Sequence, residues 1–67
     1  MQITLNGKPH QPAPASTTAG ALLGELNIVR ERVAVVINEN VVRRAELDNT
    51  PVNDGDTIEI ITMVGGG

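Results

Sequence analysis

Apolar and polar residues alternate along several stretches of the chain, a pattern typical of half-buried β-strands. At the N-terminus, Met1, Ile3 and Leu5 fall on one side and polar residues fall between them. Residues 33–37 form a β-branched run, and residues 57–63 form a second alternating stretch. β-Branched side chains favour the pleated surface of a sheet. The pattern therefore predicts strands at the start, middle and end of the chain.

The dipeptide Asn6-Gly7 follows the first strand and predicts a tight hairpin turn, because both residue types accept a positive φ. A second strand is then expected to run back over residues 8–15. Pro12 and Pro14 cannot donate to a sheet ladder, and proline in a sheet is confined to edges, strand starts and bulges. We therefore expect residues 10–15 to form an edge strand.

Apolar residues then recur at the spacing of one helix face. They are Ala19, Leu22, Leu23 and Leu26. Thr18 is expected to cap the N-terminus of this helix, and Asn27 to end it. Gly20 and Gly24 weaken the helix by up to about 1 kcal/mol each relative to alanine. The helix is therefore expected to depend on docking.

The remaining segments complete an α+β pattern. Residues 38–40 predict a turn, residues 41–43 a short return strand, and residues 44–56 a polar irregular segment with a turn at 54–56. The chain shows no internal repeat and no regular alternation of strands and helices. One helix packed on one mixed sheet of four to five strands accounts for this order.

A single helix covers only one face of a sheet. We expect the core face to carry the apolar residues Ile3, Leu5, Val33, Val35, Ile37, Ile58 and Ile60 beside the helix leucines. Four apolar residues then remain on the outer face: Ala34, Val36, Ile61 and Met63. An exposed patch of this kind often marks a partner surface. Alternatively, if the assignment of side chains to the two faces is shifted by one residue, these four residues are the buried ones.

Composition narrows the functions that the chain can perform. It has 67 residues, no cysteine, no aromatic residue and a net charge of −3. A nucleophilic thiol, a cysteine-based zinc site and base stacking are excluded, and binding to nucleic acid is disfavoured. No metal site is expected, and the single His10 has no nucleophile to serve. With no secretory signal and no membrane-spanning stretch in the sequence, we expect a cytoplasmic protein.

The sequence closes on Gly65-Gly66-Gly67, directly after the last predicted strand. Glycine has no Cβ, so its backbone can pass through a channel too narrow for other residues. We expect residues 1–64 to form the domain and residues 65–67 a flexible tail that carries a terminal carboxylate to another protein. A carboxylate must be activated before it reacts. Because the chain has no phosphate-binding loop, the activation has to come from outside. The alternative is a frayed terminus with no chemistry.

Several motifs together resemble those of the β-grasp sulfur carriers, most closely the carriers of thiamin biosynthesis. The resemblance covers the whole chain. It lies in the Asn6-Gly7 turn, the helix pattern from Thr18 to Leu26, the hairpin pattern from Asn38 to Arg44, the Asp54-Gly55-Asp56 turn before Ile58, and the end Val64-Gly65-Gly66-Gly67.

The resemblance implies a β-grasp fold and a role as protein cosubstrate rather than enzyme. An E1-like (ubiquitin-activating) adenylating enzyme would use ATP to adenylate the Gly67 carboxylate. A persulfide sulfur donor would convert it to a thiocarboxylate, which would supply sulfur to thiazole synthase. The carrier itself would bind no cofactor. Gly65 and Gly66 would permit the tail to enter the partner, and Arg44 would contact a partner.

The same resemblance also fits other functions of related carriers. Carriers for tRNA thiolation, molybdopterin synthesis and protein conjugation share the fold and the glycine end. A binding module with an inert tail and a small enzyme are the competing classes of function.

Overall fold

The computed structural model describes residues 1–63. The strands are β1 (Ile3–Leu5), β2 (Lys8–His10), β3 (Val33–Ile37), β4 (Asn40–Val42) and β5 (Thr57–Thr62). The helices are α1 (Ala19–Glu25) and two 3₁₀ segments, η1 (Arg30–Arg32) and η2 (Arg44–Asn49). The expected tail at 65–67 and the domain boundary after residue 64 lie outside the described residues. Within the described part, no helix has the length and apolar character that crossing a membrane requires.

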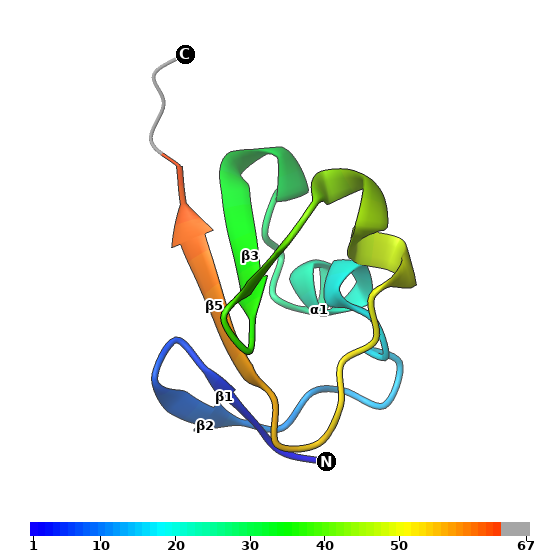
Figure 1. Cartoon of the computed structure of the whole chain (residues 1–67). Helices are drawn as coiled ribbons and strands as arrows, with labels where there is room; N and C mark the ends of the chain where they lie inside the picture. The colour runs from blue at the N-terminus through cyan, green and yellow to red at the C-terminus, as the bar shows by residue number, and fades with distance from the viewer. Residues whose placement is uncertain (64–67) are drawn as a thin grey trace.

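The five strands form one mixed sheet in the order β2-β1-β5-β3-β4. β1 and β5 run parallel at the centre, and the other neighbours are antiparallel. Figure 1 shows β5 running through the molecule between β1 and β3. The N-terminal residue lies at the end of the sheet where β5 begins (Figure 1). One helix on a mixed five-stranded sheet confirms the predicted fold class.

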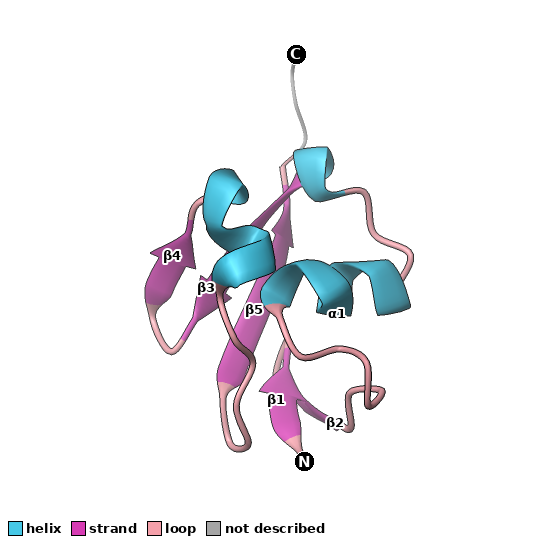
Figure 2. Cartoon of the chain, turned by 90° about the vertical axis from the view of Figure 1, so that its right-hand side faces the viewer, coloured by secondary structure: helices cyan, strands magenta, loops and turns pink. Residues whose placement is uncertain are grey.

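The core lies between the sheet and α1, which crosses one face of the sheet (Figure 2). The predicted facing is confirmed. Ile3, Val35, Ile37 and Ile58 are buried against Leu22 and Leu23, while Leu5, Val33, Ile60 and Leu26 pack against them half-buried. Thr18 caps α1 as expected, because its Oγ1 accepts the Ala21 N–H at 3.1 Å. Asn27 has the expected positive φ of 58° just after the helix.

The segment between β4 and β5 is more ordered than its polar sequence indicates. η2 places Leu47 in the core with 2% of its surface exposed, and Val52 is buried after it. The segment is tied to the start of α1, because Ala19 N–H donates to the Thr50 carbonyl and Val52 N–H to the Thr17 carbonyl. A single leucine among polar residues gives no recognisable period, so the sequence did not predict this contribution to the core.

The prediction for the second strand was wrong in its extent. β2 covers only residues 8–10, and residues 11–17 form a loop. Pro9 lies in β2 opposite Thr4, and Asn6 and Gly7 both have positive φ as the turn requires. In a hairpin with a two-residue turn, the pair that flanks the turn, here Leu5 and Lys8, is joined by hydrogen bonds. The following pair, Thr4 and Pro9, exchanges none. Pro9 is therefore tolerated, whereas Pro12 and Pro14 lie beyond the strand. The last strand ends one residue earlier than expected, and β4 is shifted by one residue.

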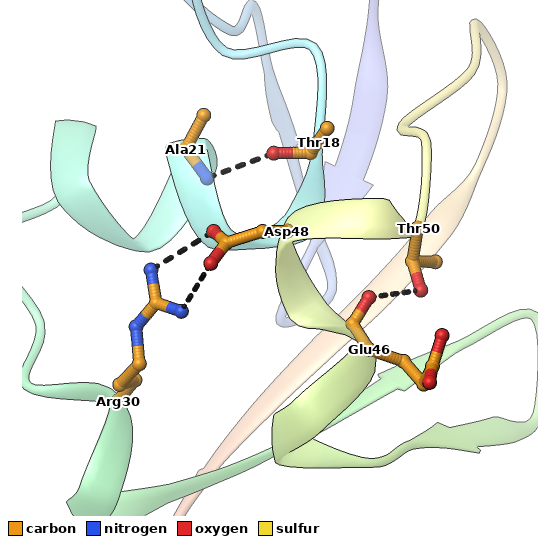
Figure 3. Close-up of polar contacts among 6 residues, drawn as sticks. All are labelled: Thr18, Ala21, Arg30, Glu46, Asp48 and Thr50. Atoms are coloured by element: carbon orange, nitrogen blue, oxygen red, sulfur yellow. Dashed lines mark hydrogen bonds and ion pairs between the residues drawn. The ribbon is translucent and has the colours of Figure 1, made fainter.

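The two helix glycines differ in what surrounds them. A Cβ at Gly20 would overlap the Asp48 carboxylate, whereas nothing lies within 4 Å of one at Gly24. Asp48 is held above Gly20 by Arg30, whose guanidinium donates to both carboxylate oxygens at 3.0 and 3.1 Å (Figure 3). This hydrogen bonding, more than the charge of Arg30, lowers the pKa of Asp48. Both side chains are solvent-accessible, so the pair itself adds little stability.

Alanine substitutions at these glycines should therefore have different effects. Gly24→Ala should raise the free energy of unfolding by up to about 1 kcal/mol, because alanine favours the helix and meets no neighbour. Gly20→Ala should be less stable than Gly24→Ala, because Asp48 has to leave Arg30. The chain has no aromatic residue, so urea unfolding is followed by far-UV circular dichroism. Equal stability of the two variants would contradict this expectation and show that the exposed Asp48 carboxylate moves aside at no cost.

Glu25, the last residue of α1, fastens the loop of residues 11–17 to the helix. Its Oε1 accepts the Ser16 hydroxyl at 2.7 Å and the Ala13 N–H at 2.8 Å, and its Oε2 lies 2.9 Å from His10 Nε2. The hydrogen bond from Ser16, followed by that from Ala13, lowers the pKa of Glu25 below its ordinary 4.5. The ionised carboxylate therefore favours the folded chain.

The contribution of Glu25 should depend on pH. A carboxyl group with a lowered native pKa stabilises the fold fully above its ordinary pKa of 4.5, and this contribution disappears as the pH falls through the native pKa. Glu25→Gln should therefore reduce stability at neutral pH, and the gap to the wild type should narrow below pH 4.5. Glu46→Gln, on the exposed side of η2, is the matched control. A gap that stays constant with pH would show that the charge of Glu25 has no role.

Candidate functional site

The predicted reacting group, Gly67, and the predicted entrance residues Gly65 and Gly66 lie outside the described residues. The structure describes the chain up to Met63, and therefore the part that leads to this tail. β5 ends at Thr62, and the Met63 N–H still donates to the Arg32 carbonyl at 2.8 Å. Backbone hydrogen bonds, to β3 and then to the end of η1, thus hold the chain up to the last described residue.

β5 is paired along both edges. Residues 33–37 of β3 lie opposite residues 58–62 of β5 in antiparallel register, and Thr4 and Leu5 of β1 lie opposite the start of β5. Ile58 is fully buried at this junction. A strand with neighbours on both sides has most of its backbone groups satisfied. The start of β5 is therefore held on both sides, whereas its end at residues 61–62 is paired with β3 alone.

Two asparagine side chains from neighbouring turns fix the position of β5. Asn6 Oδ1, in the β1–β2 turn, accepts the Ile60 N–H at 2.8 Å. Asn38, in the β3–β4 turn, accepts the Thr57 N–H through Oδ1 at 2.9 Å and donates through Nδ2 to Asp56 at 2.9 Å. Both asparagines have positive φ, a conformation that asparagine tolerates better than most residues. Each asparagine therefore forms part of a turn and also accepts a hydrogen bond from the backbone of β5.

The two aspartates in the turn before β5, Asp54 and Asp56, accept hydrogen bonds from backbone N–H groups. Buried Asp56 accepts the Asn53 N–H through Oδ2 at 2.8 Å, in addition to its bond from Asn38. Asp54 Oδ1 accepts the Gln2 N–H at 2.8 Å, which joins the turn to the N-terminus. Within residues 1–63, no group of three or more His, Asp or Glu side chains is arranged to hold a metal ion.

The outer face of the sheet carries a continuous row of apolar side chains. Ala34 lies opposite Ile61 across the β3–β5 pair, and Val36 lies opposite Val41 across the β3–β4 pair. Ile61 and Met63 are each 49% exposed and Val41 is 72% exposed, whereas Ala34 and Val36 are half-buried. We call Ala34, Val36, Val41, Ile61 and Met63 the outer-face patch. The sequence prediction missed Val41, although its alternation with Val42 in the hairpin contains the signal.

Arg44 lies beside this patch, at the end of the sheet where β5 finishes. Its guanidinium donates to the Glu31 carbonyl at 3.4 Å. With Arg43 and Met63 it borders a shallow groove of about 210 Å³ between β3, β4 and η2. The predicted patch residues and Arg44 are thus brought together, while their role in binding a partner stays a prediction.

Comparison with known proteins agrees with this architecture. The sequence pattern of the ThiS family matches residues 3–67. This chain belongs to the ThiS family. The match extends over the three terminal glycines, so the resemblance seen in the sequence motifs is confirmed at the level of the family.

Several ThiS-related proteins are similar over nearly the whole chain. The sulfur carrier protein ThiS of Thermus thermophilus is 32% identical over 65 residues, which are 97% of this chain and 98% of that protein. The crystal structure of the thiamine biosynthesis protein ThiS from Geobacter metallireducens is 38% identical, covers 100% of both chains and superposes with a TM-score of 0.84. The fold of this chain is therefore the ThiS β-grasp fold.

Two longer proteins contain a ThiS-like stretch. A thiazole synthase of Paramagnetospirillum magneticum is 40% identical and one of Magnetococcus marinus is 39% identical, each over all 67 residues of this chain. The chain spans only 20% of the length of each of these relatives. A sequence like this one therefore occurs within larger proteins named thiazole synthases.

The role of Asn38 in fixing β5 can be tested against its neighbour in the same turn. Asn38→Gly keeps the positive φ accessible but removes two side-chain hydrogen bonds, and should lower the free energy of unfolding by about 1–3 kcal/mol. Glu39→Gly should instead raise it by about 1 kcal/mol, because Glu39 has a φ of 71° and makes no described side-chain hydrogen bond. Urea unfolding measures both. If Asn38→Gly is as stable as Glu39→Gly, the two hydrogen bonds of the Asn38 side chain, to Thr57 and Asp56, do not stabilise the fold.

Proposed function

We propose that this chain is a sulfur carrier of thiamin biosynthesis and acts as a protein cosubstrate rather than as a catalyst. The observation that carries the proposal is the ThiS family match over residues 3–67, which includes Gly65, Gly66 and Gly67. The ThiS protein of Thermus thermophilus, similar over nearly its whole length, is named a sulfur carrier. In this proposal the carrier binds no cofactor and works in the cytoplasm.

The chemistry begins at the carboxylate of Gly67. An oxygen of this group attacks the α-phosphorus of ATP on an E1-like adenylating enzyme and releases pyrophosphate. The product is an acyl-adenylate, in which AMP is a good leaving group. The chain's part is to present the carboxylate on a backbone without side chains, which fits a narrow active site.

Sulfur then replaces oxygen. The terminal sulfur of a persulfide donor attacks the acyl carbon, AMP leaves, and an acyl disulfide forms. A thiol reduces its S–S bond and becomes part of a new disulfide, which leaves the thiocarboxylate on Gly67. Since the chain has no cysteine, none of these sulfur atoms belongs to its side chains.

Thiazole synthase is the proposed acceptor of this sulfur. Support comes from the two thiazole synthases that contain a stretch similar to this whole chain. Joining a carrier to the enzyme that it serves raises their effective concentration. This observation favours the thiamin pathway over tRNA thiolation, molybdopterin synthesis and protein conjugation.

The intact mass of the protein tests the proposal. After incubation with an E1-like adenylating enzyme, ATP and a persulfide donor, the mass should rise by the difference between one sulfur and one oxygen atom. Deletion of Gly67 should abolish this change and leave the fold intact by circular dichroism. Gly24→Ala is the matched control, because it alters an exposed helix glycine and should still acquire sulfur. Acquisition of sulfur by the Gly67-deleted chain would overturn the assignment of the reacting group.

A further inference from the structure

The sheet has two edge strands, β2 and β4, and they lie at opposite ends of the strand order (Figure 2). Each edge strand follows a two-residue turn, so the pair that flanks the turn is hydrogen-bonded and the following pair is not. The residue in that following pair is Pro9 in β2 and Val41 in β4. The backbone groups of Pro9 and Val41 therefore point away from the sheet.

The two edges differ in what they offer to a further strand. Proline has no N–H, so the outward position of β2 cannot donate a hydrogen bond, which is a common protection of sheet edges. Val41 has both an N–H and a C=O, and no other backbone group within residues 1–63 pairs with them. Its side chain is 72% exposed. β2 is therefore closed to strand addition, and β4 is open.

The side chains along β4 follow an order that is complementary to itself. Val41 lies between Glu39, two residues before it, and Arg43, two residues after it. Arg43 has an extended backbone, with φ −69° and ψ 146°, and borders the same groove of the outer face as Val41. Glu39 lines the neighbouring groove with Val36 and Glu59. An acidic, an apolar and a basic side chain thus follow one another along the outer side of this edge.

Both charged side chains are free to bind something outside the chain. Glu39 and Arg43 are exposed, and neither side chain makes a hydrogen bond or an ion pair with any of residues 1–63. Arg30, by contrast, is already held by Asp48. The edge of β4 therefore combines unpaired backbone groups with unpaired charges of both signs.

We propose that β4 pairs antiparallel with β4 of a second copy of this chain, centred on Val41. Each Val41 N–H then donates to the Val41 carbonyl of the other copy. Because the strands run in opposite directions, Glu39 of each copy faces Arg43 of the other. Opposite charges and β-branched side chains placed across neighbouring strands stabilise their pairing. The two-fold symmetry makes every one of these contacts occur twice.

This association joins two five-stranded sheets into one sheet of ten strands. The two-fold axis is perpendicular to the sheet, so the two β5 strands run in opposite directions, and each is separated from the interface by β3 and β4. The proposal does not rest on the proposed function. A contact between two three-residue strands is smaller than the roughly 1,200 Å² of stable interfaces, so we expect a weak dimer.

Sedimentation equilibrium of the purified chain at low ionic strength tests the proposal. Interference optics are used, because the chain has no aromatic residue. The apparent mass should rise from one chain toward two between about 0.05 and 2 mM protein. The amide signal of Val41 should shift over the same range, because its N–H exchanges water for a carbonyl. A mass that stays at one chain, or an unchanged Val41 amide signal, would refute the dimer and leave β4 open only to a strand of another protein.

Val41→Pro reproduces in β4 the feature that closes β2. The N–H that it removes points away from β3, so the fold should be retained by circular dichroism, as β2 retains Pro9. The dimer should be lost. Lys8→Pro is not a suitable control because the Lys8 N–H pairs with β1, whereas Lys8→Glu changes an exposed side chain of β2 and should leave the dimer intact. A folded Val41→Pro variant that still dimerises would contradict the proposal.

Charge reversals test the register without changing the backbone. Glu39→Arg and Arg43→Glu should each weaken the dimer about tenfold, because two attractive pairs become repulsive. The double variant restores both pairs and should dimerise like the parent. An equimolar mixture of the two single variants should associate more strongly than either variant alone, because each Arg then meets a Glu.

Net charge gives the opposite result. Glu39→Arg has a net charge of −1 and Arg43→Glu one of −5, since each reversal changes the parental −3 by two. If net repulsion alone governed association, Glu39→Arg would associate better than the parent and better than the mixture. That outcome would refute the pairing of Glu39 with Arg43.

Discussion

The pairing of β5 along both of its edges is the interaction on which the rest of the structure depends. β5 is the last strand in the sequence but lies in the middle of the sheet, with β1 parallel on one side and β3 antiparallel on the other. Its Ile58 is completely buried, and Asn6 and Asn38 reach over from the adjacent turns to hold its backbone. The path of β5 is therefore determined by β1, β3 and the two turns together.

A chain of this size has material for one covering layer only. α1 and η2 bury one face of the sheet, and Leu47 extends this cover toward β4. The opposite face keeps its apolar residues in contact with solvent. Such a surface carries a risk of non-specific association, which flanking charges reduce. The charged residues around this face therefore help to keep the free protein from associating with itself through it.

The sequence was informative where a periodic pattern was strong. Alternation in residues 33–37 and 57–63 predicted which side chains face the core, and the spacing of the leucines predicted α1. The sequence was uninformative where order comes from contacts between distant segments. Leu47 is buried because the chain before Thr50 folds back onto α1, and no local pattern announces such a contact. The prolines at 12 and 14 were compatible with an edge strand, but the hairpin stops before them. The family motifs indicated the tail, whereas the position of Arg43 and Arg44 beside Met63 needed the fold.

The parallel pairing of β1 and β5 has a mechanical consequence. The backbone N–H groups of Thr4 and Asn6 donate to the carbonyls of Asp56 and Ile58, both at 2.9 Å. Tension between the start of β1 and the end of β5 runs along the two strands. These bonds then share the load in shear instead of opening one after another like a zipper. The β1–β5 junction therefore resists a force that pulls the start of β1 and the end of β5 away from each other.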